Sequence, residues 1–501
     1  MPCPRRFIVS AIVASALFAA LAAPALAQTN NSDKPTWWDK YQFLATHGPD
    51  TCTGQPGFKV GPNVDVSNEC GPQSETFITL NPSQPTMLAG GSNEIFRLPM
   101  RGYFSSDGGS SWGGVDLPLP PAKGNGINFG SDPSLAFDSS GNLYYSYIVV
   151  YFGNGNGINA TAMGVARSTD GGRSYPQFTL FGLEGGSGHF NDKPMIAADT
   201  NPASPFRDSV YVAWDAATGG SSGGGVRVAR STDHGATFTT VRVDDPRGPG
   251  RAIGAQPFVG PNGEVYVAWN DYAGNAIVFN RSVDGGATWG TPRVVSSKRL
   301  PFDIAIPAEF SRGALVYPAC EADRSRGAHR GRLYCTWMDL TTSGNTDIFA
   351  SASDDGGTTW SPAVATTDRL QNVDRFNHWL SVDPVTGDAN VSFYDTRNDT
   401  TGARFMTDIY FTQLRGGNGS WTSPNLRVTD VSSNEHDCNG LFPCVAIDYG
   451  NQTGDYAGLV SYGGVSHPIW TDSRDQLDPF AGCRTGLAME EVFTAVINRI
   501  R

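Results

Sequence analysis

The octapeptide SVDGGATW, residues 282–289, is one of five similar stretches along the chain. The other four are SSDGGSSW at 105–112, STDGGRSY at 168–175, STDHGATF at 231–238 and SDDGGTTW at 353–360. All share the pattern Ser-x-Asp-x-Gly-x-Ser/Thr-aromatic, and successive copies lie roughly fifty to seventy residues apart, which indicates a repeat architecture. The repeat predicts the fold, so the function must come from residues that the repeat does not explain.

Each copy has the composition of a connector between two β-strands. Its aspartate, small polar residues and glycines suit a tight turn, because the aspartate side chain accepts backbone hydrogen bonds and glycine readily adopts positive φ. The closing aromatic, Trp289 in the copy quoted first, is large enough to pack the turn against neighbouring strands. We interpret the five aspartates as structural, because an active site does not need one acid per repeat.

These octapeptides resemble the Asp box, or BNR repeat, of the sialidase-type β-propellers. The resemblance implies blades of four antiparallel strands, with the box in the turn between the third and fourth strands, on the face away from the ligand site. It does not identify a substrate, because one fold carries many functions.

Two apolar strands recur before the octapeptide and give the number of blades. A strand that ends in an aspartate, such as VYVAWD ending at Asp215, follows an earlier strand that recurs seven times. We therefore predict an all-β propeller of seven four-stranded antiparallel blades, with six blades as the alternative. The stretch 59–67 has no other unit to join, so we expect it to close the ring as the outer strand of the last blade, which removes a free edge.

The first 27 residues resemble a secretory signal peptide. Arg5 and Arg6 precede an apolar run, and Ala25-Leu26-Ala27 forms a small-residue cleavage site. The expected organisation is a signal peptide at 1–27, an N-terminal arm at 28–58 and a single propeller domain at 59–501. The mature chain is expected to be secreted or periplasmic, because no later apolar segment is long enough to span a membrane.

The charge of the chain bears on its partners. The formal net charge is −12 and becomes −14 once Arg5 and Arg6 are removed with the signal, and no cluster of lysines and arginines stands out. This balance disfavours nucleic acid as a partner. A glycan or glycoconjugate is the expected partner, and the sequence leaves the oligomeric state open.

Seven cysteines follow the signal peptide. In an oxidising compartment we expect the disulfides Cys52–Cys70 and Cys320–Cys335, the latter on adjacent strands of one repeat. We expect Cys438 to pair with Cys444 and leave Cys483 unpaired, although other pairings among these three remain open.

Candidate functional residues gather where the first strand of each unit begins and the second strand ends, around one mouth of the central channel. We interpret repeated strand-end acids such as Asp215, Asp271 and Asp339 as caps for backbone amides. Residues that break the repeat are better candidates, among them His378 and the Asp455-Tyr456 pair.

The resemblance to sialidases implies three chemical parts. Arginines would bind the carboxylate of the substrate, an acid would protonate the leaving oxygen, and tyrosine would act as nucleophile. The candidates are Tyr456 as nucleophile with Asp455 beside it, Asp132 or Asp192 as the acid, and a substrate-binding set of Arg375, Arg397, Arg474 and His378. Ion pairs of Arg397 with Asp395 and of Arg474 with Asp472 are the structural alternative.

Three functions compete. The first is a secreted sialidase-like glycoside hydrolase that acts on terminal acidic sugars. The second is a propeller that binds glycan or protein without catalysis, and the third is a polysaccharide lyase that uses His378 or His436 with Tyr456. No cofactor is required by these schemes, although the acids Glu75, Asp132, Asp192 and Asp455 could bind Ca²⁺.

Overall fold

The structure is a computed structural model, and it divides the chain into two compact units, Val60–Asn498 and Met1–Lys59 with Arg499–Arg501. It describes residues 57–67, 71–95, 97–122, 126–153, 158–185, 190–216, 224–245, 252–417, 419–436, 452–474 and 490–500. The expected signal peptide, nearly all of the expected arm, and Cys52, Cys70, Cys438, Cys444 and Cys483 lie outside these ranges. Within them, no helix has the length and apolar character needed to cross a membrane.

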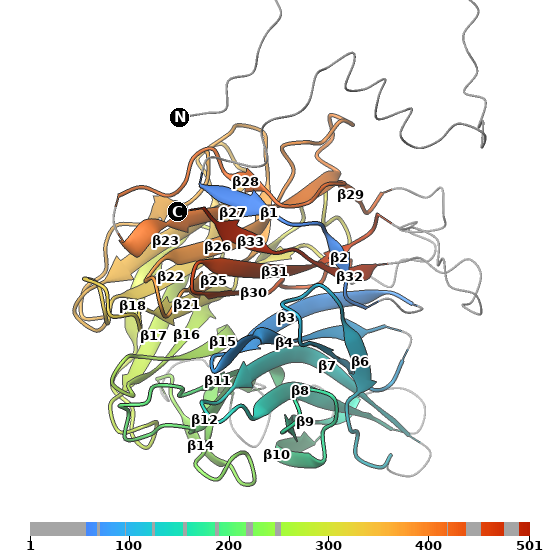
Figure 1. The fold of residues 1–501 in the computed structure, drawn as a ribbon, viewed down its shortest axis with the longest axis vertical. Helices are drawn as coiled ribbons and strands as arrows, with labels where there is room; N and C mark the ends of the chain where they lie inside the picture. Colours follow the sequence, from blue (N-terminus) through green and yellow to red (C-terminus); the bar gives the residue numbers. More distant parts are fainter. Residues whose placement is uncertain are drawn as a thin grey trace, which may run out of the picture. The chain divides into compact units, whose positions relative to one another are not determined.

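The unit Val60–Asn498 is an all-β propeller of seven blades, as the repeat predicts (Figure 1). The first three blades are β3 (Gln73–Asn81), β4 (Gln84–Glu94), β5 (Arg101–Ser105) and β6 (Gly113–Asp116); β7 (Ile127–Phe137), β8 (Leu143–Phe152), β9 (Ile158–Ser168) and β10 (Gln177–Gly185); and β11 (Asp192–Ala198), β12 (Val210–Ala216), β13 (Gly225–Ser231) and β14 (Thr239–Arg242). The next three are β15 (Ala252–Val259), β16 (Val265–Asp271), β17 (Ala276–Ser282) and β18 (Arg293–Ser297); β21 (Pro318–Ala322), β22 (Leu333–Leu340), β23 (Thr346–Ser353) and β24 (Val364–Ala365); and β25 (Arg375–Val382), β26 (Ala389–Asp395), β27 (Met406–Leu414) and β28 (Leu426–Arg427). The seventh contains β30 (Leu459–Tyr462), β31 (Val465–Asp472), β32 (Glu491–Thr494), β33 (Ile497–Arg499), β2 (Val64–Asp65) and β1 (Phe58–Val60).

Three short additions complete the described elements. They are the two-stranded sheet of β19 (Asp303–Ile304) and β20 (Ala314–Leu315), the strand β29 (Ser433–Asn434) on β27, and the 3-10 turn η1 (Arg415–Gly417). The β19–β20 pair is a separate sheet in the connection between the fourth and fifth blades, whereas β29 extends the sheet of the sixth blade.

The predicted closing strand is confirmed. The early strand β2 pairs antiparallel with the late strand β32, where Val64 lies opposite Thr494 and Asp65 opposite Phe493. Figure 1 shows this blue strand beside the dark red one. Because both ends of the described propeller meet in one blade, the seventh blade gains the outer strand that the end of the chain does not supply.

The five octapeptides fold alike in the turns between third and fourth strands. In the copy 282–289, the Ser282 hydroxyl donates to Asp284, while the amide and hydroxyl of Thr288 donate to the same carboxylate at 2.8 and 2.6 Å. Hydrogen bonding by Thr288 lowers the pKa of Asp284 to about 2. The same contacts recur in the other four copies, which accounts for the structural use of every aspartate.

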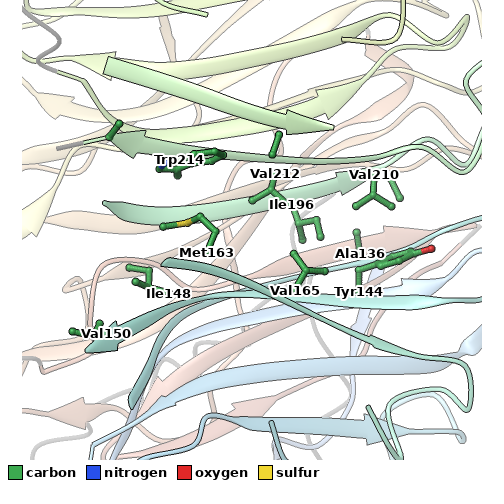
Figure 2. Packing of buried hydrophobic residues seen from close by; sticks show 13 residues of the cluster. Ala136, Tyr144, Ile148, Val150, Met163, Val165, Ile196, Val210, Val212 and Trp214 are labelled. Carbon is green, nitrogen blue, oxygen red and sulfur yellow. The ribbon is translucent and has the colours of Figure 1, made fainter. Parts of the chain in front are cut away.

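Apolar side chains between neighbouring blades make up the core. Between the second and third blades, Ile148, Met163 and Val165 face Val212 and Trp214 (Figure 2). These residues are at most 2% exposed. Burying each such side chain contributes about 1.5–3 kcal/mol, so contacts between blades, repeated around the ring, supply much of the stability.

The disulfide expected between Cys320 and Cys335 is present. The two residues lie directly opposite on β21 and β22, and they are 15 residues apart in the chain. We expect the double substitution of both cysteines by alanine to lower the free energy of unfolding by about 3 kcal/mol, the contribution of a crosslink of this span. Urea unfolding of both proteins would test this, and an unchanged midpoint and slope would contradict it.

Candidate functional site

A β-bulge recurs near the start of five inner strands, at one end of the propeller. In each case the register between the first and second strands shifts, and one residue adopts positive φ. These residues are Glu75 (52°), Asp132 (62°), Lys193 (57°), Gly254 (70°) and Asn377 (42°). Because a bulge breaks the alternation of a strand, it re-aims side chains that simple alternation would place elsewhere.

The bulges link neighbouring blades at this mouth. Asn93 donates to Glu75 at 2.9 Å and accepts the amide of Asp132 at 2.7 Å, so it joins the first blade to the second. Asn377 donates to the carbonyl of Gly454 at 2.8 Å and joins the sixth blade to the seventh. The inner-strand starts therefore converge, as the sequence predicted.

Asp455 is the centre of the site. It is 6% exposed, and it accepts contacts from Lys193 Nζ at 3.1 Å, Tyr317 Oη at 3.0 Å and Arg312 Nε at 2.7 Å. These partners come from the third blade and from the segment between the fourth and fifth blades. A single carboxylate therefore connects three separate parts of the ring.

Lys193 lies between two aromatic rings. Its ammonium group is 4.0 Å from the centroid of Tyr317 and 4.0 Å from that of Tyr456, and the residue is 1% exposed. Desolvated cation–π contacts of this kind contribute about 2 kcal/mol. The positive charge among the acids of the mouth is thus supplied by Lys193 and held in place from both sides.

Burial and neighbouring charges shift the pKa values of the carboxyl groups of the mouth in opposite directions. Burial and the neighbouring Asp132, which is also hydrogen-bonded to it, raise the pKa of Asp192 well above its usual value. Burial, Asp132 and Asp455 likewise raise the pKa of Glu75. Burial also acts to raise the pKa of Asp455, but the charges of Lys193 and Arg312 outweigh it, and the net shift is downward. Neighbouring carboxyl groups of one site therefore have pKa values shifted in opposite directions.

The segment that carries Arg312 forms one wall of the mouth. Gln452 accepts the amides of Ser311 and Arg312, and it donates to the carbonyl of Ala308 at 3.1 Å. The hydroxyl of Thr453 donates to the buried Glu309. The β19–β20 insertion is therefore fastened to the seventh blade, and this fixes Arg312 over Asp455.

The predicted tyrosine and its neighbour have different partners. Tyr456 is 2% exposed and donates its hydroxyl to the carbonyl of Pro133 at 3.0 Å. The tyrosine hydroxyl that reaches Asp455 belongs to Tyr317. Burial raises the pKa of both phenols well above 10, so each is neutral in the resting protein.

The three predicted substrate arginines are engaged with carboxylates of the chain itself. Arg375 and Arg397 share Asp395, at 2.8 and 2.6 Å, and Arg474 contacts both oxygens of Asp472 at 2.9 and 2.8 Å. Arg474 has no partner in common with the other two. The structure therefore shows the ion pairs named as the alternative, and it does not gather the three arginines around Tyr456.

The predicted histidines also lie apart from Tyr456. Burial lowers the pKa of His378 to about 4, and this residue bonds to the backbone of Thr336 in the fifth blade. His436 contacts the carbonyl of Pro307 at 2.6 Å and stacks on Phe405. Neither histidine contacts Tyr456 in the described part of the chain, so the geometry that a lyase would need is not assembled there.

The four acids considered for Ca²⁺ do come together, but around Lys193. Across the ranges described above, no group of three or more His, Cys, Asp or Glu side chains has a metal-binding arrangement.

Sequence reasoning missed Lys193, Arg312 and Tyr317. Lys193 stands one residue from the predicted Asp192, and the bulge that brings it to the mouth has no sequence signature here. The sequence does hold a signal that could have located Arg312 and Tyr317. The longest interval between consecutive box aspartates runs from Asp284 to Asp355, which indicates an insertion between those blades.

Comparisons with known proteins give distant similarities. No family model matches the sequence, and no curated protein matches it. A solved protein of unknown function from Dyadobacter fermentans is 13% identical, with 89% of this chain and 100% of that chain covered and a TM-score of 0.45. A leech intramolecular trans-sialidase is 13% identical (75% and 72% covered, TM-score 0.46), and an α-L-arabinofuranosidase from Fusarium graminearum is 13% identical (71% and 98% covered, TM-score 0.44). These similarities are too low to transfer residues or activity to this chain.

Proposed function

We propose that this protein is a secreted, sialidase-like glycoside hydrolase that acts on terminal acidic sugars at the channel mouth. One arrangement carries the proposal: the phenol of Tyr317 donates to Asp455 at 3.0 Å, and Asp192, whose pKa is raised, lies in the same site as Asp455, whose pKa is lowered. Environments that push two carboxyl groups apart in pKa assign an acid and a base. The signal-like N-terminus and the Cys320–Cys335 disulfide support secretion.

In this scheme Asp192 donates a proton to the leaving oxygen, with Asp132 hydrogen-bonded to it. The phenol oxygen of Tyr317 attacks the anomeric carbon while its proton passes to Asp455, 3.0 Å away. The glycosidic bond breaks, and water then attacks the anomeric carbon of the glycosyl–tyrosine, giving a proton to the ionised Asp192 while the phenol leaves and takes its own proton back from Asp455. Tyr456, the tyrosine predicted from sequence, would instead position Lys193 through its ring.

Arg312 is the candidate group for binding the carboxylate of the sugar. Its side chain is 36% exposed, and its Nε and Nη2 atoms contact Asp455. In the described part of the chain its Nη1 atom has no partner, which leaves one charged donor at the mouth. A guanidinium group suits a carboxylate because its geometry matches two oxygens.

The test is hydrolysis of a fluorogenic α-sialoside by the wild-type chain and two matched variants. Tyr317→Phe should lower kcat by at least about a hundredfold, since the positioned hydroxyl is lost, whereas Tyr456→Phe should retain most activity. Loss only in Tyr456→Phe would return the nucleophile role to that residue, and absence of wild-type turnover would contradict sialidase activity.

A second candidate is a glycan-binding propeller without catalysis. The observation that favours it is that Asp455 is already fully hydrogen-bonded: its two oxygens accept contacts from three donors. A carboxylate satisfied in this way is stable in the resting protein without any substrate. Binding of sialosides without turnover would support this candidate.

A further inference from the structure

Two adjoining cavities lie along the fifth and sixth blades. The first has a volume of about 480 Å³ and the second about 510 Å³, and both are lined by Ser343 and Gln371. Cavities of this size suit small ligands such as a sugar residue. Because they share lining residues, an extended ligand could occupy both.

The cavities open on the same end of the propeller as the mouth. They are lined by residues at the ends of β22 and β26 and in the connections that follow. The pairing of β25 with β26 identifies this end. Asp395, the last residue of β26, lies opposite Arg375, and Arg375 precedes the bulge residue Asn377 by two positions. The mouth and the cavities therefore face the same end of the propeller.

Two arginines line the first cavity without a partner. Arg299 and Arg369 are exposed, and neither guanidinium group makes a hydrogen bond or ion pair with any residue that the structure describes. Their charge is available to a ligand. The acids of this cavity are occupied: Asp339 accepts three backbone amides, and Asp347 is bound by Arg375 and Thr367.

Two more arginines line the second cavity, and they differ in exposure. Arg404 uses Nη1 on the buried Asp374 at 2.7 Å, and its side chain remains 35% exposed. Arg397 is 11% exposed and is bound to Asp395, Asp368 and Asn425, so it is a fixed part of the wall. The remaining acid, Asp399, accepts the amides of Arg404 and Met406 and the hydroxyl of Thr401.

The backbone around the cavities is held in an unusual conformation. Arg369, Asn372 and Arg404 adopt positive φ of 53°, 55° and 65°. Such residues cost free energy, of order 1–3 kcal/mol each, and they persist mainly where ligands bind or chemistry occurs. Two of these three residues, Arg369 and Arg404, present guanidinium groups to the cavities.

We propose that the two cavities form one groove for a glycan that carries carboxylate groups on successive sugars, with Arg299 and Arg369 binding one carboxylate and Arg404 another. We call this set of three residues the arginine groove. The planar guanidinium fork matches a carboxylate and gives specificity over neutral sugars. The groove is separate from the catalytic residues proposed above, so binding there does not require turnover.

Titration calorimetry of the full chain with tetragalacturonate would test the groove, with maltotetraose as the neutral control. The exposed double variant Arg299→Gln/Arg369→Gln should weaken tetragalacturonate binding by about tenfold or more, since charge-assisted bonds are lost. Arg326→Gln is the matched control, because Arg326 is exposed in the connection from β21 to β22, at the far end of these strands.

Three results with these ligands and variants would overturn the proposal, and a fourth concerns sulfated dextran. The three are no binding of tetragalacturonate by the wild type, equal binding of maltotetraose, and equal weakening by Arg326→Gln. Binding of sulfated dextran but not of tetragalacturonate would also overturn the assignment to carboxylates. The chain carries a net charge of −12, so an anionic oligosaccharide has no general electrostatic reason to bind. Retained sialoside hydrolysis in the double variant would show that the mouth works independently of the groove.

Discussion

Asp192→Asn is expected to lower kcat/KM for an α-sialoside by about 10²–10⁴-fold, the range that a positioned proton donor contributes. The amide has the shape of the carboxyl group but no proton to give to the leaving oxygen. The loss should be smaller for a leaving group of low pKa, such as nitrophenol, because such a group departs without protonation. Initial rates with both kinds of leaving group would measure the difference.

The pH profile gives the control for this prediction. Activity of the wild type should fall as pH rises through the elevated pKa of Asp192, because the proton donor is then lost. Asp132→Asn removes a charge that raises this pKa, so the alkaline limb should move to lower pH. Full activity of Asp192→Asn, or an alkaline limb that stays in place in Asp132→Asn, would rule out Asp192 as the acid.

The fold was predictable because local chemistry fixes each repeated element. The Ser-x-Asp-x-Gly pattern encodes a turn whose hydrogen bonds form within eight residues, as in the copy 282–289. The stretch that became β2 was assignable because every other predicted strand already had a blade. Strands β24 and β28 are only two residues long, and their ends had no comparable signal.

For the site, the sequence predicted which blades contribute residues but not which side chains touch. Strand starts placed Glu75, Asp132 and Asp455 together, since neighbouring blades must converge there. The bulges were not foreseen, because an inserted residue leaves the alternating sequence pattern almost unchanged while it re-aims one side chain. For this reason the place of Lys193 in the mouth was not predicted. The contacts of Arg312 and Tyr317 depend on an insertion outside the repeat, so repeat logic cannot place them.

Lys193→Met is expected to lower the free energy of unfolding by about 3 kcal/mol or more, because it leaves the buried Asp455 with less compensation. Lys193 is 1% exposed and lies between the rings of Tyr317 and Tyr456, so the variant also loses two cation–π contacts. Methionine keeps most of the length and apolar volume of the side chain, which limits any effect of an empty cavity. Urea unfolding at neutral pH would measure the change.

The control is Arg312→Gln, which removes the other positive charge on Asp455. Its side chain is 36% exposed, so water screens the charge and the loss should be less than half of that for Lys193→Met. The double variant Lys193→Met/Asp455→Asn should be more stable than the sum of its single changes predicts, because the uncompensated charge is gone. Strict additivity of the two changes would show that this ion pair does not hold the mouth together, and Lys193 would then stabilise it through its aromatic contacts alone.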